Sequence, residues 1–110
     1  MSLHDVYSKV REAVVGKKIV VARYKNCLRR MCPHVIGKNK LGREQVLFYQ
    51  FAGESSHGLG PSGSPSNWRC IPVIGLADVS VIDGEWHTAP NHSRPQTCVY
   101  VIDAQVRFEF

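Results

Sequence analysis

The sequence contains no apolar run that approaches the roughly 18 residues of a membrane-spanning helix. Its first fifteen residues, MSLHDVYSKVREAVV, carry charges throughout and lack the apolar core of a secretion signal. We therefore expect a cytoplasmic protein with no membrane partner. With 110 residues, 44% of them hydrophobic, the chain can bury a core of its own, so we expect a single domain over residues 1–110.

Known catalytic sequence motifs are also absent. Residues 58–63 spell G-x-G-x-x-G, but a proline and no helical periodicity follow them, so they do not open the helix that a dinucleotide fold requires. This glycine-rich segment contains no lysine, which excludes a P-loop, and no serine stands in a G-x-S-x-G motif. The acidic residues are scattered and suggest no general acid–base pair. We expect no enzyme and no cofactor, although a nucleophilic cysteine–histidine pair stays open.

Cysteine is scarce, with four residues. In a reducing cytosol these should be free thiols, and Cys70 and Cys98, which lie within apolar stretches, should belong to the core. Cys27, Cys32 and His34 could contribute to a zinc site with other histidines, but their spacings match no common zinc module. We therefore expect no metal.

Acidic residues are rare in the first part of the chain. Residues 1–43 hold eleven Lys or Arg against two acids, which gives +9, and residues 44–110 hold three against seven, which gives −4. The net charge of +5 therefore conceals a strongly basic first part. Such asymmetry either marks a face for an anionic partner or is an ordinary solvated surface.

Apolar residues recur at helical spacing near the N-terminus and predict an amphipathic helix over about 3–15, with Gly16 as its C-cap. Strand-like segments follow at 17–24, 27–37, 43–51, 68–82 and 98–110. The two-residue link between the first two strands predicts a hairpin, and Pro33 predicts a bulge or an edge position. The fourth segment should bend at Pro72 or Gly75.

Two loops interrupt this pattern. In residues 53–66, eleven of fourteen residues are Gly, Ser or Pro, which predicts a long flexible loop over about 52–67. The dipeptide Asp83-Gly84 predicts a tight hairpin into residues 85–88, and a second loop covers 89–97. One helix followed by about five antiparallel strands predicts a mainly β fold, a small SH3-like or Sm-like antiparallel barrel, with an OB-fold as the alternative.

The candidate binding residues are cationic, aromatic or amide side chains. Arginine and lysine suit phosphates, because guanidinium groups bind them bidentately, and exposed aromatic rings can stack on bases. At least half of the aromatic rings should instead be buried in the core of so small a barrel. The candidates are Tyr24, Arg29, Arg30, His34, Lys38, Lys40, Arg43, Tyr49, Gln50, Trp68 and Arg69.

The ordered segments REAVVGKKIVVARYKN, PHVIG, LGREQVLFYQF and WRCIPVIGLADVSVI, within residues 8–82, resemble the WYL family. Of the tripeptide that names this family only Leu47 is present. The resemblance implies an Sm-like or SH3-like barrel that serves bacterial regulators as a sensing module for nucleic acid or nucleotide-like ligands. It also implies ligand-binding roles for Tyr24, Arg30, His34 and Arg69.

The leading hypothesis is a non-enzymatic regulatory module whose basic face binds a nucleic acid or a small phosphorylated ligand. The alternative is a protein-interaction or homo-oligomerisation module that pairs through an edge strand and the apolar C-terminus, where Phe108 and Phe110 lie.

Overall fold

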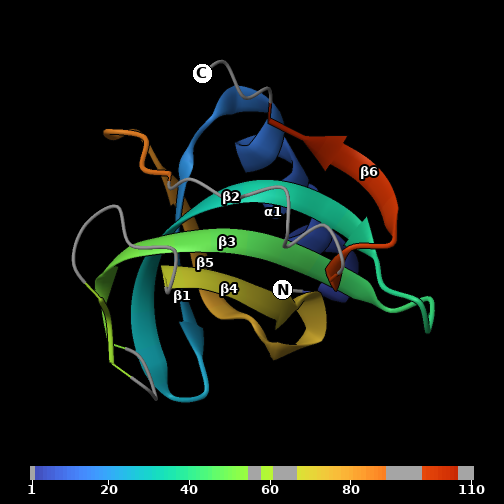
Figure 1. The fold of residues 1–110 in the computed structure, drawn as a ribbon, viewed down its shortest axis with the longest axis horizontal. Helices are drawn as coiled ribbons and strands as arrows, with labels where there is room; N and C mark the ends of the chain where they lie inside the picture. Colours follow the sequence, from blue (N-terminus) through green and yellow to red (C-terminus); the bar gives the residue numbers. More distant parts are fainter. Residues whose placement is uncertain (1, 55–57, 61–66, 89–97, 107–110) are drawn as a thin grey trace.

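The computed structural model describes residues 2–54, 58–60, 67–88 and 98–106. One helix, α1 (Leu3–Gly16), precedes the strands of a single antiparallel sheet (Figure 1). The strands are β1 (Ile19–Tyr24), β2 (Cys27–Lys38), β3 (Glu44–Gly53), β4 (Trp68–Pro72), β5 (Ala77–Ile82) and β6 (Val101–Gln105), and the short 3-10 helix η2 (Val73–Gly75) joins β4 to β5.

The sheet is ordered β4-β3-β2-β1-β5, and β6 also pairs with β2. β1 and β6 pair with the same edge of β2: β1 pairs with residues 27–31 and β6 pairs with residues 35–38. Figure 1 shows β2 and β3 as long, strongly curved strands that form most of the barrel wall. The fold is mainly β with an N-terminal helix, and the expectation of a small SH3-like or Sm-like antiparallel barrel is confirmed.

A capping box starts α1: the Ser2 hydroxyl accepts from the Asp5 amide, and the Asp5 carboxylate accepts from the Ser2 amide. The helix ends at Lys17, whose φ of 52° makes it the left-handed cap. The expectation that Gly16 is the C-cap is therefore wrong by one residue, because Gly16 is still helical.

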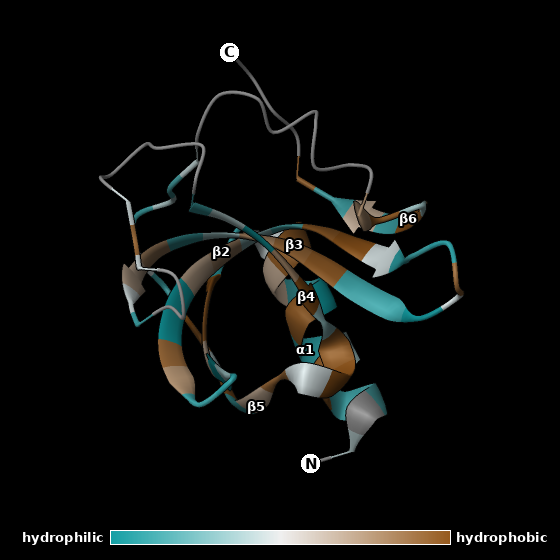
Figure 2. Cartoon of the chain, turned by 60° about the horizontal axis from the view of Figure 1, so that its bottom comes forward, coloured by the Kyte–Doolittle hydropathy of each residue, from teal (hydrophilic) through white to brown (hydrophobic). Residues whose placement is uncertain are grey.

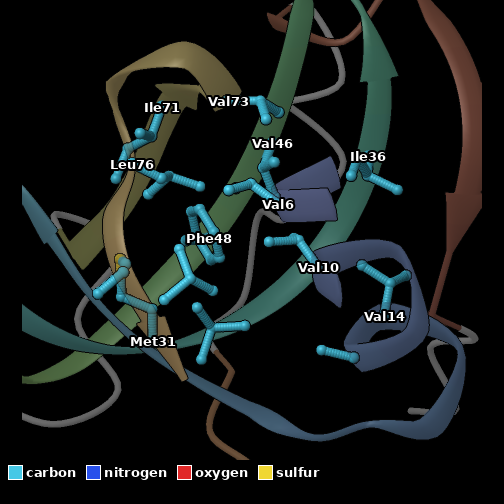
Figure 3. Packing of buried hydrophobic residues seen from close by; sticks show 14 of the residues in the cluster. Val6, Val10, Val14, Met31, Ile36, Val46, Phe48, Ile71, Val73 and Leu76 are labelled. Atoms are coloured by element: carbon cyan, nitrogen blue, oxygen red, sulfur yellow. The ribbon is translucent and has the colours of Figure 1, made fainter. Parts of the chain in front are cut away.

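The helix covers the concave, inner face of the sheet. Val6, Val10 and Val14, spaced one turn apart, point from α1 towards the strands in Figure 3. They meet Phe48 of β3 and Met31 of β2, both without exposed surface. Figure 2 shows hydrophobic residues concentrated where the strands cross α1, so the main core lies between helix and sheet.

Local turn chemistry sets the first two hairpins. Lys25 and Asn26 both have positive φ, at 50° and 64°, which is the conformation of a tight two-residue hairpin turn. The predicted hairpin of β1 and β2 is thus confirmed. In the β2–β3 turn, the Asn39 side-chain oxygen accepts from the amides of Leu41 and Arg43, and Gly42 takes a φ of 76°.

The predicted strand over 68–82 is bent as expected, since β4 ends at Pro72 and η2 ends at Gly75. The hairpin predicted at Asp83-Gly84 is wrong, because residues 83–88 form no strand. β5 pairs with β1 instead, with Ile82 opposite Ile19. Residues 86–88 instead contact His34, Cys32 and Phe51, so tertiary contacts override the local turn signal.

A bulge interrupts β2 at His34. Pro33 lies opposite Phe48 and Val35 lies opposite Leu47, so His34 is the extra residue without an opposite partner. The bulge predicted near Pro33 is confirmed. It reverses the alternation of side chains: Met31 and Ile36 both belong to the main core, although they are five positions apart.

The last predicted strand, 98–110, is shorter than expected: β6 covers Val101–Gln105, and residues 107–110 lie outside the described residues. The long loop begins later than expected, because β3 continues to Gly53; most of the loop, like residues 61–63 of the glycine motif, lies outside the described residues. No helix within the described residues is long and apolar enough to span a membrane.

The prediction of four free thiols is wrong, because Cys70 of β4 forms a disulfide with Cys98. Cys70 is exposed and Cys98 half-buried, so neither is a fully buried core thiol. Cys27 and Cys32 are free. Because disulfides persist mainly in oxidising compartments, the cytoplasmic localisation stays a prediction.

Candidate anion-binding site

The β1–β2 hairpin places a buried cation at one end of the barrel. Arg29 lies opposite Ala22, a residue of the main core, and shares the parity of Met31, so its side chain enters the inner face. Only 3% of Arg29 is exposed. Its neighbour Arg30 has the opposite parity and is exposed.

Gln50 holds the Arg29 guanidinium. The Gln50 amide nitrogen donates to the carbonyls of Ala52, at 3.2 Å, and Glu54, at 2.7 Å. These two bonds fix the amide so that its oxygen faces Arg29, whose Nη1 donates to it at 3.2 Å. The orientation of the guanidinium is therefore set by backbone carbonyls at the end of β3.

The ring of Tyr24 lies against the same guanidinium. Arg29 Cζ is 5.2 Å from the ring centroid, and Lys25 Nζ is 5.5 Å from it. Both distances fit cation–π contacts. A Cβ at Gly75 would lie 2.7 Å from Tyr24 Cε1, so any side chain at that position would displace the ring.

Arg69 adds a second cation from β4. It lies opposite Phe48, and its two terminal nitrogens donate to the carbonyls of Trp68 and Gly58, both at 3.2 Å. Burial lowers the pKa of Arg69, and the positive charge of Arg29 lowers it further. The two guanidinium groups therefore repel each other within this end of the barrel. We call Tyr24, Arg29, Gln50 and Arg69 the arginine cluster.

Arg29 has unused capacity to bind an anion. Within the described residues its buried Nε has no hydrogen-bond partner, and no ion pair includes Arg29. A buried guanidinium without a counter-ion loses several kcal/mol of hydration, as an order of magnitude. The arrangement can recover that free energy if an anion accepts from Nε.

A second group of predicted residues forms an aromatic layer on the outer face. Trp68 packs edge-on against His34 and Tyr49, with ring centroids 4.8 and 5.0 Å apart, and Trp86 lies 4.9 Å from His34. His34 Nδ1 bonds the Cys32 carbonyl at 2.8 Å. Nε2 of His34 lies 3.2 Å from the hydroxyl of Thr88. His34 has no exposed surface, which suits a structural role for its imidazole.

The outer layer brings a cysteine and a histidine into contact. The Sγ atom of Cys32 accepts from the backbone amide of His87 at 3.3 Å, while the His87 ring stacks on Phe51. Burial raises the pKa of Cys32 to about 11. The thiol is therefore neutral at pH 7, which does not favour a nucleophilic role. No group of three metal-ligating side chains occurs within the described residues.

The third group lies at the β2–β3 turn. Lys38, Lys40 and Arg43 are exposed there, with Lys40 Nζ 5.9 Å from the Tyr100 ring and Arg43 beside a shallow apolar hollow of about 470 Å³. Nine positions of β2, about 30 Å of extended strand, separate Arg29 from Lys38. The predicted cations therefore fall into two groups, one at the start of β2 and one in the turn that follows it.

Trp86 and Thr88, which were not among the predicted site residues, lie against His34. Arg29 and Arg30 were predicted as equivalent cations, but only Arg29 is buried. The parity of Arg29 with Met31 was the signal that could have separated them.

Comparison with protein-family models, curated proteins and solved structures found no match. The resemblance to the WYL family stays a prediction.

Proposed function

We propose that this chain is a non-enzymatic regulatory module that binds a phosphate-bearing partner, a nucleic acid or a nucleotide, at the arginine cluster. The observation that carries this proposal is the Arg29 guanidinium, which is 3% exposed, has an unpartnered Nε and forms no ion pair within the described residues. A structural arginine normally has such a partner.

A phosphoryl group fits this environment better than other common anions. Guanidinium groups bind phosphate oxygens through paired hydrogen bonds, and Gln50 already holds Arg29 in a fixed orientation. The fixed orientation reduces the side-chain entropy that binding must remove. A preorganised cation of this kind supports binding rather than general surface charge.

The exposed surface around the cluster is also cationic. Lys25 and Arg30 flank Arg29 along the hairpin and are exposed. Arg23 is exposed too, and Asp78 pairs with it at 3.3 Å. Lys25 and Arg30 can therefore attract a polyanion and speed its encounter. The resemblance to WYL domains, which act as sensing modules in regulators, supports the same function.

The test is fluorescence anisotropy of internally labelled single- and double-stranded DNA and RNA that carry terminal phosphates, titrated with the protein at two salt concentrations. We expect micromolar or tighter binding that weakens steeply as salt rises, because bound phosphates release counterions. Arg29→Met should weaken binding at least tenfold. Arg43→Met, the same substitution in the β2–β3 turn, should change the affinity less than twofold. Binding independent of salt, or equal for both variants, would refute the proposal.

Self-association is the second candidate function. β6 pairs with β2 along one edge, and Tyr100, Val101 and Ile102 are exposed by 66%, 56% and 41%. Such an apolar strand edge can pair with a second copy. Phe108 and Phe110 lie outside the described residues.

Light scattering after gel filtration tests this second function. We expect a dimer for the wild type and a monomer for Val101→Lys, which places a charge on the exposed strand. Lys9→Glu on α1 serves as a charge-changing control that should leave the mass unchanged. A wild type that stays monomeric at high concentration would exclude the function.

A further inference from the structure

The arginine cluster restricts access to its central donor. Arg29 is almost wholly buried, and its Nε has no contact with solvent. Half-buried Tyr24 and Arg69 are its neighbours on the side of the hairpin and of β4. Side chains shift rotamers more readily than strand backbone does, so Tyr24 and Arg69 are the groups that a ligand atom would displace to reach Nε.

This restricted access favours a terminal phosphate over a phosphate within a nucleic-acid strand. A phosphodiester within a nucleic-acid strand carries a sugar on each side, so it cannot approach a nearly buried atom without bringing both sugars with it. A phosphomonoester has one substituent and three free oxygens. It can project into the cluster while the rest of the ligand stays outside.

The charge of the cluster also favours a phosphomonoester. Arg29 lacks a counter-ion among the described residues, and Arg69 is close enough for the two positive charges to interact. A diester phosphate carries one negative charge. A monoester carries close to two at neutral pH, so it interacts more strongly with two guanidinium groups in a weakly solvated environment.

We propose that the arginine cluster recognises a terminal phosphomonoester, either the phosphorylated end of a nucleic-acid strand or a free mononucleotide. This inference rests on the proposed function and deepens it. The terminal phosphate enters between Tyr24 and Arg69 and accepts from Arg29 Nε. Exposed Lys25 and Arg30 lie outside, where they contact whatever follows that phosphate.

The experiment uses four internally fluorescein-labelled thymidine decamers that differ only at one end. They carry a 5′-phosphate, a 3′-phosphate, a 5′-methyl phosphate, or hydroxyls at both ends. We expect at least one terminal phosphate to bind tenfold or more tightly than the hydroxyl decamer. The methyl phosphate, which has the same size but one charge fewer, should bind within threefold of the hydroxyl decamer.

Variants connect this preference to the cluster. Arg29→Met should reduce the affinity of the phosphorylated decamer to that of the hydroxyl decamer. Arg30→Ala, the exposed neighbour, should weaken all four decamers by the same factor and leave their ratio unchanged. A preference that survives in Arg29→Met would overturn the assignment of the site.

Competition with thymidine 5′-monophosphate and 3′-monophosphate identifies the source of the phosphate. Displacement of the phosphorylated decamer by either mononucleotide at similar concentrations indicates a free nucleotide, and displacement that needs a hundredfold excess indicates the end of a strand. If all four decamers bind equally and Arg29→Met weakens them all, the proposed function stands and the inference fails. If neither the decamers nor the mononucleotides bind at low salt, both fail.

Discussion

The hydroxyl of Tyr7 in α1 donates a hydrogen bond of 2.6 Å to the carboxylate of Asp103 in β6. Arg11, one turn further along the helix, donates to the same oxygen at 3.1 Å. This bond from Tyr7 lowers the pKa of Asp103, and the contacts with Arg11 lower it further. The first and last elements of the described chain are thus joined through one carboxylate.

We therefore expect Asp103→Asn to destabilise the protein at neutral pH, by no more than about 1 kcal/mol because the group is exposed. The folded pKa of Asp103 is lower than the unfolded one, so its contribution is present above the unfolded pKa, near 4, and disappears as pH falls through the folded pKa. Urea unfolding at pH 7 and at pH 2.5 measures this. A difference between variant and wild type that persists undiminished at pH 2.5 would contradict the assignment.

The disulfide should contribute more than any surface ion pair. Cys70 and Cys98 are 28 residues apart in the sequence. Closing a loop of that length stabilises the folded state by about 3–4 kcal/mol in the chain-entropy model. The double variant C70A/C98A should lose stability of that order, measured by urea unfolding.

Reduction provides the internal check on this bond. Dithiothreitol should lower the unfolding midpoint of the wild type and of Cys27→Ala, but not that of C70A/C98A. If dithiothreitol leaves the wild type unchanged, the bond does not contribute to stability.

The two free thiols should differ in reactivity. Cys27 is half-buried beside the hairpin turn, whereas Cys32 is fully buried and its pKa is raised to about 11. At pH 8, iodoacetamide should alkylate Cys27 in the folded protein and leave Cys32 unmodified, as read by peptide mass spectrometry. In urea both should react. Rapid alkylation of Cys32 under native conditions would show that the outer aromatic layer opens.

Substitution of Arg29 should not lower the stability of the protein, unlike substitution of most buried residues. Because its charge has no counter-ion among the described residues, Arg29→Met removes an uncompensated cation and keeps much of the side-chain volume. We expect this variant to be as stable as the wild type or more stable, by up to about 2 kcal/mol. Thermal unfolding measures the change, with Met31→Ala as a control that should lose about 2–5 kcal/mol. A destabilised Arg29→Met would indicate a structural arginine.

Much of the fold was predictable because its determinants are local. β-branched runs bounded by turn residues located β1, β2 and β3 within two residues at each boundary. The disulfide and the absence of a strand over residues 83–88 were not predictable in this way. They depend on which strands become neighbours, and β5 finds its partner in β1, some sixty residues earlier.

The candidate site was predictable as a set of residues but not as an arrangement. Arg29, Gln50 and Arg69 come from three strands, and only the pairing of β2 with β3 and of β3 with β4 brings them together. Strand parity alone would have separated Arg29 from Arg30. The division of the predicted cations into two groups required the length and curvature of β2.

The bulge at His34 has a consequence for how this sequence can vary. Substitution at position 34 affects one imidazole and its neighbours, but deletion would restore simple alternation along β2. Pro33 opposite Phe48 and Val35 opposite Leu47 would then be adjacent, so Val35, Ile36 and every later residue of the strand would keep their present sides. Among related chains, the register of β2 should therefore tolerate the loss of this residue, and the core that faces α1 should differ little between chains with and without it.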